Sequence, residues 1–193
     1  MTSPAHPVLL APAGSLADQT ALALDFDLVY REHARFVWRS LSRLGVAPEH
    51  LADAMQDVFI VVHRKLPSFE GRSSVRTWLF GIAMRVASDW ARRVRRHPSE
   101  PLVDTIQDAR ENAPFERAAR SEALSTLHRL LDELSPDQRA VFVLVELEQM
   151  SIAEAASAVS ANIHTTTSRL KVARQKFEAA LRRHRASDGR SPP

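Results

Sequence analysis

Residues 151–170 read SIAEAASAVSANIHTTTSRL, and this stretch decides the fold. Ser151 followed three residues later by Glu154 is a capping-box pattern that predicts a helix start, and small apolar residues then recur at helical spacing. A three-residue turn at 160–162 separates this short helix from a longer amphipathic one that continues to about Leu181. Two helices joined by such a turn predict a helix-turn-helix.

The outward face of the second helix is polar and basic. Small hydroxyl side chains allow close approach to a DNA groove, and arginine can bind a guanine edge or a phosphate. The residues on this face are Thr165, Thr167, Ser168, Arg169 and Lys171. The pattern alone also fits an αα-hairpin whose outer face is only solvated, so both interpretations stay open at this point.

Working outward, the same signals predict helices in the rest of the chain. Residues 135–138 repeat the capping-box pattern with Pro136 in the first turn, and leucines precede them at helical spacing. Helical periodicity also predicts helices over about 25–44, 48–66 and 75–96. Since no stretch reads as a strand, we predict an all-α fold of two small helical domains.

Composition excludes several classes of protein. The 193 residues are 45% hydrophobic and contain no cysteine, which excludes disulfide scaffolds and thiolate zinc sites and suits a reducing cytoplasm. The longest apolar run is far short of a membrane span, and we expect no secretory signal, because the short apolar patch near the N-terminus lacks a basic flank. No histidine pair stands beside a glutamate at metal-ligand spacing, and no nucleotide-binding glycine motif occurs. We therefore expect no enzyme activity, no metal and no cofactor.

Charge is segregated along the chain, although the net charge is only 26 − 23 = +3. Residues 85–97 carry 5 − 1 = +4 and residues 169–185 carry 7 − 1 = +6, whereas residues 98–116 carry 1 − 5 = −4. This arrangement indicates two contacts with a polyanion, joined by a stretch that avoids it. Solvated helix faces are the alternative explanation.

These patterns predict five segments in chain order. They are a disordered N-terminal tail at 1–24, a helical domain at 25–97, a flexible acidic linker at 98–118, a second helical domain at 119–184 and a C-terminal tail at 185–193.

Two blocks of the sequence resemble the extracytoplasmic-function (ECF) group of bacterial sigma-70-type factors. The first is DAMQDVFIVVHRKL at 53–66 with FEGRSSVRTWL at 69–79, which looks like conserved region 2. The second is LSPDQRAVF at 134–142, then MSIAE at 150–154 and TTTSRL at 165–170, which looks like region 4. The resemblance implies a sigma factor that binds core RNA polymerase, directs promoter-specific transcription initiation and helps to melt DNA.

The resemblance also implies roles for individual residues. Asp53, Gln56 and Asp57 would meet the clamp helices of the largest polymerase subunit, and the flap of the second-largest subunit would be a further contact. The residues implied at the −10 element are Phe69, Gly71, Ser73, Ser74, Arg76, Arg85, Arg92 and Arg93. Those implied at the −35 element are Thr165, Thr167, Ser168, Arg169, Lys171 and Arg174. An anti-sigma factor, often membrane-bound in this group, is a further implied partner.

Some interpretations stay open. Phe69 fits either a base-binding loop or a plug beneath that loop, whereas Trp78 and Trp90 are expected in the core. A stand-alone helix-turn-helix regulator that never touches polymerase is the alternative function, and the acidic face of residues 53–57 discriminates between the two.

The sequence departs from the group's usual pattern at several positions. Gly81, Met84 and Arg85 replace usual residues of the −10 reader, so the promoter preference of a relative does not transfer. Ser160 replaces the usual turn glycine and must tolerate any positive φ required there, and Thr166 replaces an apolar residue. Because Thr167 and Val172 replace residues that are often basic, we predict weak affinity for the −35 element.

Overall fold

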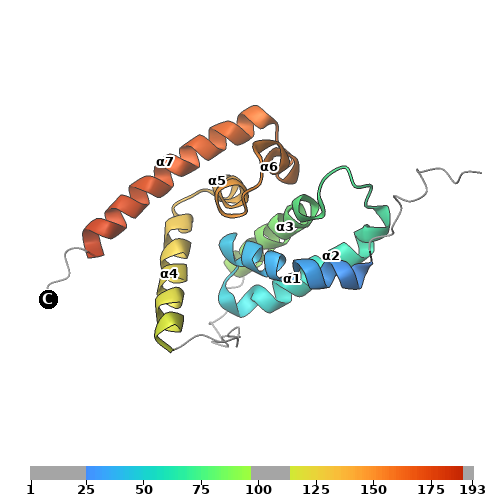
Figure 1. The fold of residues 1–193 in the computed structure, drawn as a ribbon, viewed down its shortest axis with the longest axis horizontal. Helices are drawn as coiled ribbons and strands as arrows, with labels where there is room; N and C mark the ends of the chain where they lie inside the picture. The colour runs from blue at the N-terminus through green and yellow to red at the C-terminus, as the bar shows by residue number, and fades with distance from the viewer. Residues whose placement is uncertain (1–24, 97–113, 189–193) are drawn as a thin grey trace, which may run out of the picture.

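The structure, a computed structural model, describes residues 25–96 and 114–188. Within these two ranges every regular element is helical and no strand occurs (Figure 1). The first module contains α1 (Phe26–Arg43), α2 (Leu51–Lys65) and α3 (Val75–Arg96). The second contains α4 (Pro114–Asp132), α5 (Pro136–Phe142), α6 (Ile152–Ala158) and α7 (Ile163–Asp188). The predicted all-α fold of two helical domains is confirmed.

Several predicted segments extend beyond the described residues. The N-terminal tail at 1–24, residues 98–113 of the linker and residues 189–193 of the C-terminal tail all lie outside them. At the inner ends of these segments, α4 already begins at Pro114 and α7 continues to Asp188.

The first module packs three helices around an apolar core. Apolar residues that recur at helical spacing in the three predicted helices, such as Val37, Val62 and Leu79, are completely buried. Gly45 has a φ of 96° directly after α1, a left-handed conformation that favours glycine. The predicted helix at 48–66 instead starts as a short 3₁₀ turn, η1 (Pro48–His50), before α2 begins.

The second module begins two of its helices with complete capping boxes, as predicted. The Ser135 hydroxyl accepts from the Gln138 amide at 3.4 Å and the Gln138 side chain accepts from the Ser135 amide at 3.2 Å. Ser151 and Glu154 form the same pair, at 3.2 and 2.9 Å. Between these helices, α5 runs directly into a π-helical turn, η3 (Val143–Leu147). Helices α6 and α7 form the predicted helix-turn-helix.

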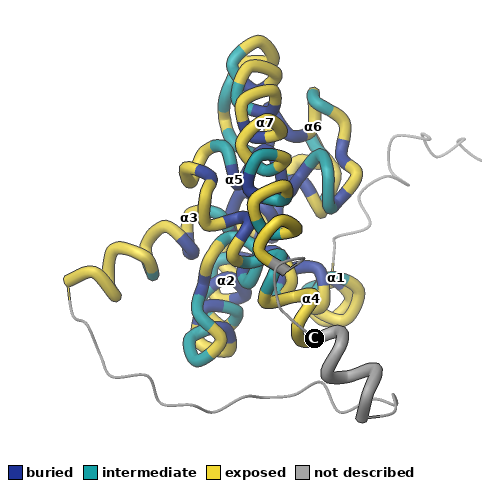
Figure 2. Tube along the Cα trace, turned by 90° about the vertical axis from the view of Figure 1, so that its left-hand side faces the viewer, coloured by how far each residue is buried: buried dark blue, intermediate teal, exposed yellow. Residues whose placement is uncertain are grey.

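The two modules pack against each other. Their buried apolar side chains form one continuous cluster, in which α6 lies on α3. The contact is so close that a Cβ atom on Gly81 would lie 3.1 Å from the carbonyl oxygen of Ala158. The C-terminal end of α3, residues 91–96, is exposed beyond this contact (Figure 2). Sequence reasoning predicted two domains joined by a linker and did not predict that they pack together.

Candidate protein and nucleic-acid interfaces

The acidic face of α2 is only partly open to a partner. Asp53 and Gln56 are exposed, as the sequence predicted for a binding face. Asp57 is instead tied to α3, because its Oδ2 accepts from the Trp90 indole N–H at 3.0 Å and pairs with Arg93 at 3.5 Å. Asp57 therefore fixes α2 against α3, while Asp53 and Gln56 remain available for contact.

An exposed apolar groove lies beside this face. It has a volume of about 850 Å³, and Gln56 contributes to its wall. Tyr30 and Phe59 meet edge to face across it with ring centroids 4.6 Å apart, and Tyr30 and Ile60 are each about 40% exposed. Contiguous exposed apolar surface of this kind is typical of a protein-binding site.

The loop between α2 and α3 contains the first four residues predicted for the −10 element. Phe69 is half-buried with its ring 4.8 Å from that of Trp78, so it packs beneath the loop in this structure. Gly71 has a φ of 66° and open space around it. Ser74 caps α3, because its hydroxyl accepts from the Thr77 amide at 3.1 Å, whereas Ser73 has no such role in helix capping.

The predicted DNA-binding arginines of α3 have different environments. Arg92 and Arg93 lie on the exposed C-terminal end of the helix, where they pair with Asp89 and Asp57 and line a shallow groove of about 390 Å³. Arg85 is exposed at the middle of the helix. Arg76, at the opposite end, is turned toward the second module, so the structure does not bring the whole set into one surface.

The start of α7 explains two unusual residues. Thr166 is completely buried, and its hydroxyl donates to the carbonyl oxygen of Asn162 at 2.9 Å, which satisfies the polar group in the core. Ser160 has a φ of 53°, so it adopts the positive φ that glycine usually provides in this turn. Asn162 also accepts from the Thr165 amide at 2.7 Å and thereby caps the helix, a role that sequence reasoning missed.

The outward face of α7 is partly neutralised by acids of its own module. Arg169 pairs with Asp137 at 2.6 Å and Arg174 pairs with Glu146 at 2.6 Å. Thr167, Ser168 and Lys171 are exposed. The six residues predicted for the −35 element thus lie on one helix, although two of its cations are engaged by neighbouring carboxylates.

Three titratable groups have shifted pKa values. Burial and the Arg139 and Arg43 guanidinium groups lower the pKa of His128, against the opposing effect of Asp132. Burial, followed by Arg76, lowers the pKa of His33. In the α6 cap, the hydrogen bonds from Ser151 lower the pKa of Glu154.

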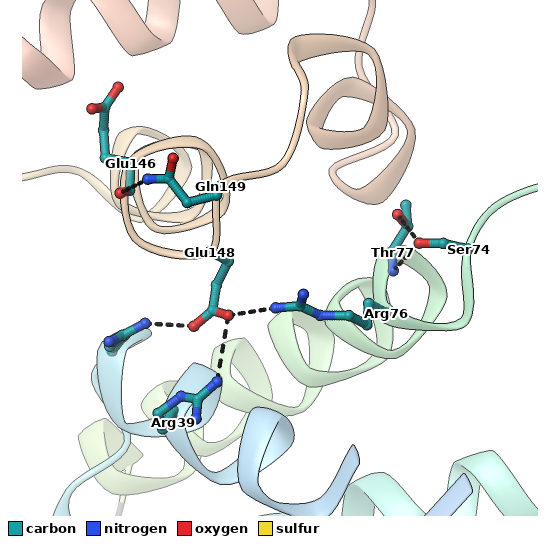
Figure 3. A network of polar contacts seen from close by, with 8 residues as sticks. Arg39, Ser74, Arg76, Thr77, Glu146, Glu148 and Gln149 are labelled. Atoms are coloured by element: carbon teal, nitrogen blue, oxygen red, sulfur yellow. Dashed lines mark hydrogen bonds and ion pairs between the residues drawn. The ribbon is translucent and has the colours of Figure 1, made fainter. Parts of the chain in front are cut away.

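Sequence reasoning missed a buried carboxylate that joins the modules. The Glu148 side chain, only 3% exposed, receives hydrogen bonds from Arg43 and, at 2.8 Å, from Arg76, with Arg39 at 3.7 Å (Figure 3). Arg76 and Arg43 lie 72 and 105 residues away along the chain, so no local pattern could have pointed to this contact.

Residues 25–96 and 114–188 contain neither a metal-binding cluster nor a membrane-spanning helix. No group of histidine and acidic side chains there is placed to hold a metal ion. Among the same residues, none of the helices combines the length and apolar character that crossing a bilayer requires.

Comparison with known protein families assigns both modules. The family described as Sigma-70 region 2 matches residues 29–97, and the family described as Sigma-70 region 4 matches residues 124–177. The ECF RNA polymerase sigma factor SigX of Bacillus subtilis is 33% identical over 162 residues, which cover 79% of this chain and 84% of the relative. The ECF sigma factor SigM of Mycobacterium tuberculosis is 31% identical over 156 residues, covering 81% and 76%.

Solved structures share the fold. CnrH, solved in complex with the cytosolic domain of CnrY, aligns with a TM-score of 0.62 at 25% identity over 86% of this chain and 89% of that one. The sigma factor RpoE of Bartonella quintana, solved with the anti-sigma factor NepR, aligns with a TM-score of 0.64 at 23% identity over 82% and 97%. With regions 2 and 4 in this order and relatives of this identity along most of its length, the chain belongs to the ECF sigma factors of the sigma-70 family.

Proposed function

We propose that this sigma factor binds core RNA polymerase and directs initiation at promoters that carry −10 and −35 elements. One observation supports this function above the others: region 2 and region 4 occur in one chain, and each carries an exposed basic helix, α3 and α7. Its contribution is binding, orientation and help in DNA melting, with no covalent chemistry of its own. It acts in the cytoplasm, beside the chromosome and the polymerase.

The polymerase-binding surface in this proposal is the exposed part of α2. Asp53 and Gln56 face the clamp helices of the largest subunit, while Asp57 acts indirectly by holding α2 on α3. The second module provides the contact with the flap of the second-largest subunit.

The DNA-binding surfaces follow the two basic helices. At the −10 element the proposal assigns backbone contacts to Arg76, Arg85, Arg92 and Arg93, and base contacts to Phe69, Gly71, Ser73 and Ser74. If the loop extracts a base, the Phe69 ring must give up its contact with the Trp78 ring. At the −35 element the exposed Thr167, Ser168 and Lys171 act directly. Thr165, Arg169 and Arg174 complete that surface. The two arginines bind DNA phosphates in place of the carboxylates with which they pair in the free protein.

We further propose that an anti-sigma factor binds this protein. CnrH, at 25% identity, was solved with the cytosolic domain of CnrY, which supports a protein partner of this kind. The apolar groove between α1 and α2 gives such a partner a binding site on this chain.

Run-off transcription with core polymerase on a library of randomised promoters tests the function. We expect defined start sites, and at least tenfold weaker retention of core polymerase by Asp53→Lys. Glu122→Lys, the same charge reversal at an exposed position of α4, is the matched control and should retain polymerase normally. Sequence-specific binding to duplex promoters by a protein that never retains polymerase would instead establish the stand-alone regulator.

A further inference from the structure

Glu148 is a buried carboxylate whose cationic partners all belong to the other module. It directly follows η3 in the second module, whereas Arg39 and Arg43 lie on α1 and Arg76 lies on α3 (Figure 3). A carboxylate that is 3% exposed is strongly destabilised unless cations compensate it. The docking of the modules therefore supplies the charge that this side chain requires.

A second group of contacts holds the end of α1. Arg139 of α5 is 8% exposed; its Nε donates to the main-chain oxygen of Arg43 at 2.5 Å and its Nη1 to Asp132 at 2.6 Å. The same guanidinium lies against Gly45, where a Cβ atom would come within 3.1 Å of it. His128 of α4 adds a hydrogen bond to Ser42 at 3.0 Å.

The third contact covers the middle of α3. Gly81 touches the carbonyl oxygen of Ala158, at the C-terminal end of α6, as described above. Ser157, Ala158 and Ser160 of the helix-turn-helix face Thr77, Gly81 and Arg85 of α3 across a small cleft of about 210 Å³. The second module therefore lies on the helix that is proposed to read the −10 element.

The docked arrangement conflicts with simultaneous reading of both promoter elements. The −10 and −35 elements are separate stretches of one duplex, which lengthens by about 3.4 Å for each base pair between them. In the docked protein α6 of the helix-turn-helix packs directly on α3, and Arg76 binds a carboxylate where the proposed function needs a phosphate. The modules must separate before both elements can be bound.

We propose that Glu148 is the central contact of an autoinhibitory docking, in which it occupies the Arg39/Arg43/Arg76 site and keeps the free sigma factor closed. This inference rests on the proposed function. Engagement with core polymerase separates the modules, exposes the middle of α3 and releases Arg76 for the DNA backbone.

The absence of cysteine from the chain makes the docking measurable in the full-length protein. Spin labels on Ser88→Cys in α3 and Gln175→Cys in α7, both exposed positions, report the distance between the modules by pulsed electron paramagnetic resonance. We expect one short, narrow distance distribution for the labelled parent and at least a tenfold fall in the ratio of docked to open protein for Glu148→Gln.

Two further variants make the result decisive. Glu146→Gln removes the same charge two residues away, where the carboxylate pairs only within its own module, and should leave the distances unchanged. Gly81→Leu separates α3 from α6 sterically and removes no polar group. If Glu148→Gln reduces the helical content, the Gly81→Leu protein is therefore the variant that tests the docking. Unchanged distances in a Gly81→Leu protein of normal helical content would overturn the proposal, as would a parent protein that is already open.

Distance measurements with and without core polymerase distinguish a failure of the autoinhibition proposal from a failure of the proposed function. Its addition should lengthen the distances in the parent protein, and transcription from a still-docked protein would refute autoinhibition. If the protein never binds polymerase, the proposed function fails, whereas the distances in the free protein still test the docking.

Discussion

Ser40 offers a test of polar burial in α1. Its side chain is completely buried, and its hydroxyl oxygen has no hydrogen-bond partner among the described residues. Burying a hydroxyl without a partner costs about 1–3 kcal/mol. Ser40→Ala removes this cost and gains up to about 0.5 kcal/mol of helix propensity, while the small void left behind costs about 0.5–1 kcal/mol. We therefore expect the free energy of unfolding to rise by about 1–2 kcal/mol.

Urea denaturation followed by far-UV circular dichroism measures this change. With a denaturant dependence of about 2 kcal/mol per molar urea, the midpoint should rise by roughly 0.5–1 M. Ser42→Ala is the matched control two residues along the same helix, because its hydroxyl is bonded to His128 at 3.0 Å and its removal should lower stability by about 1 kcal/mol. An unchanged or lower midpoint for Ser40→Ala would refute the reasoning.

Three other changes have defined outcomes. Ser160→Gly relieves the positive φ in the turn and should raise the free energy of unfolding by about 0.5–1 kcal/mol in the same assay, so a lower midpoint would contradict the strain argument. Because burial and neighbouring guanidinium groups lower the pKa of His128, the unfolded chain binds the proton first. Stability should therefore fall progressively as the pH drops from about 6.5, the usual histidine pKa, toward the lowered pKa of the folded protein, and urea midpoints for His128→Gln should show a weaker loss. Thr167→Arg adds a cation to the exposed face of α7, so affinity for a −35 duplex should rise and the slope of its salt dependence should steepen by about one. An unchanged affinity over the salt series would contradict the predicted weakness of this contact.

The helices were predictable because their signals are local. The two capping boxes, at Ser135 and Ser151, are patterns of residues three apart, and the structure contains both. The helix-turn-helix likewise follows from periodicity within about 30 residues. Even the strain at Ser160 was predictable, since the usual glycine is missing from the turn.

The environments of the candidate site residues were less predictable, because they depend on distant parts of the chain. Asp53 and Asp57 are four residues apart and share one face of a helical wheel, but of the two only Asp57 is reached by Trp90 and Arg93 from α3. In the same way, no local pattern in the sequence gives Arg169 an acidic partner, whereas in the folded protein it forms an ion pair with Asp137. The packing of the modules has no periodic signature at all, since it depends on single residues such as Glu148 that meet their partners only after folding.

The π-helical turn η3, which continues α5, sets the direction in which the carboxylate that directly follows it points. The amide of Glu148 donates to the carbonyl oxygen of Val143, five residues back instead of four, at 2.9 Å. One extra residue in a turn rotates later side chains by about 100° around the helix axis. This rotation aims Glu146 at Arg174 and Glu148 at the opposite module. Deletion of one apolar residue from η3 would thus point the carboxylate elsewhere, although the protein would keep every charged residue.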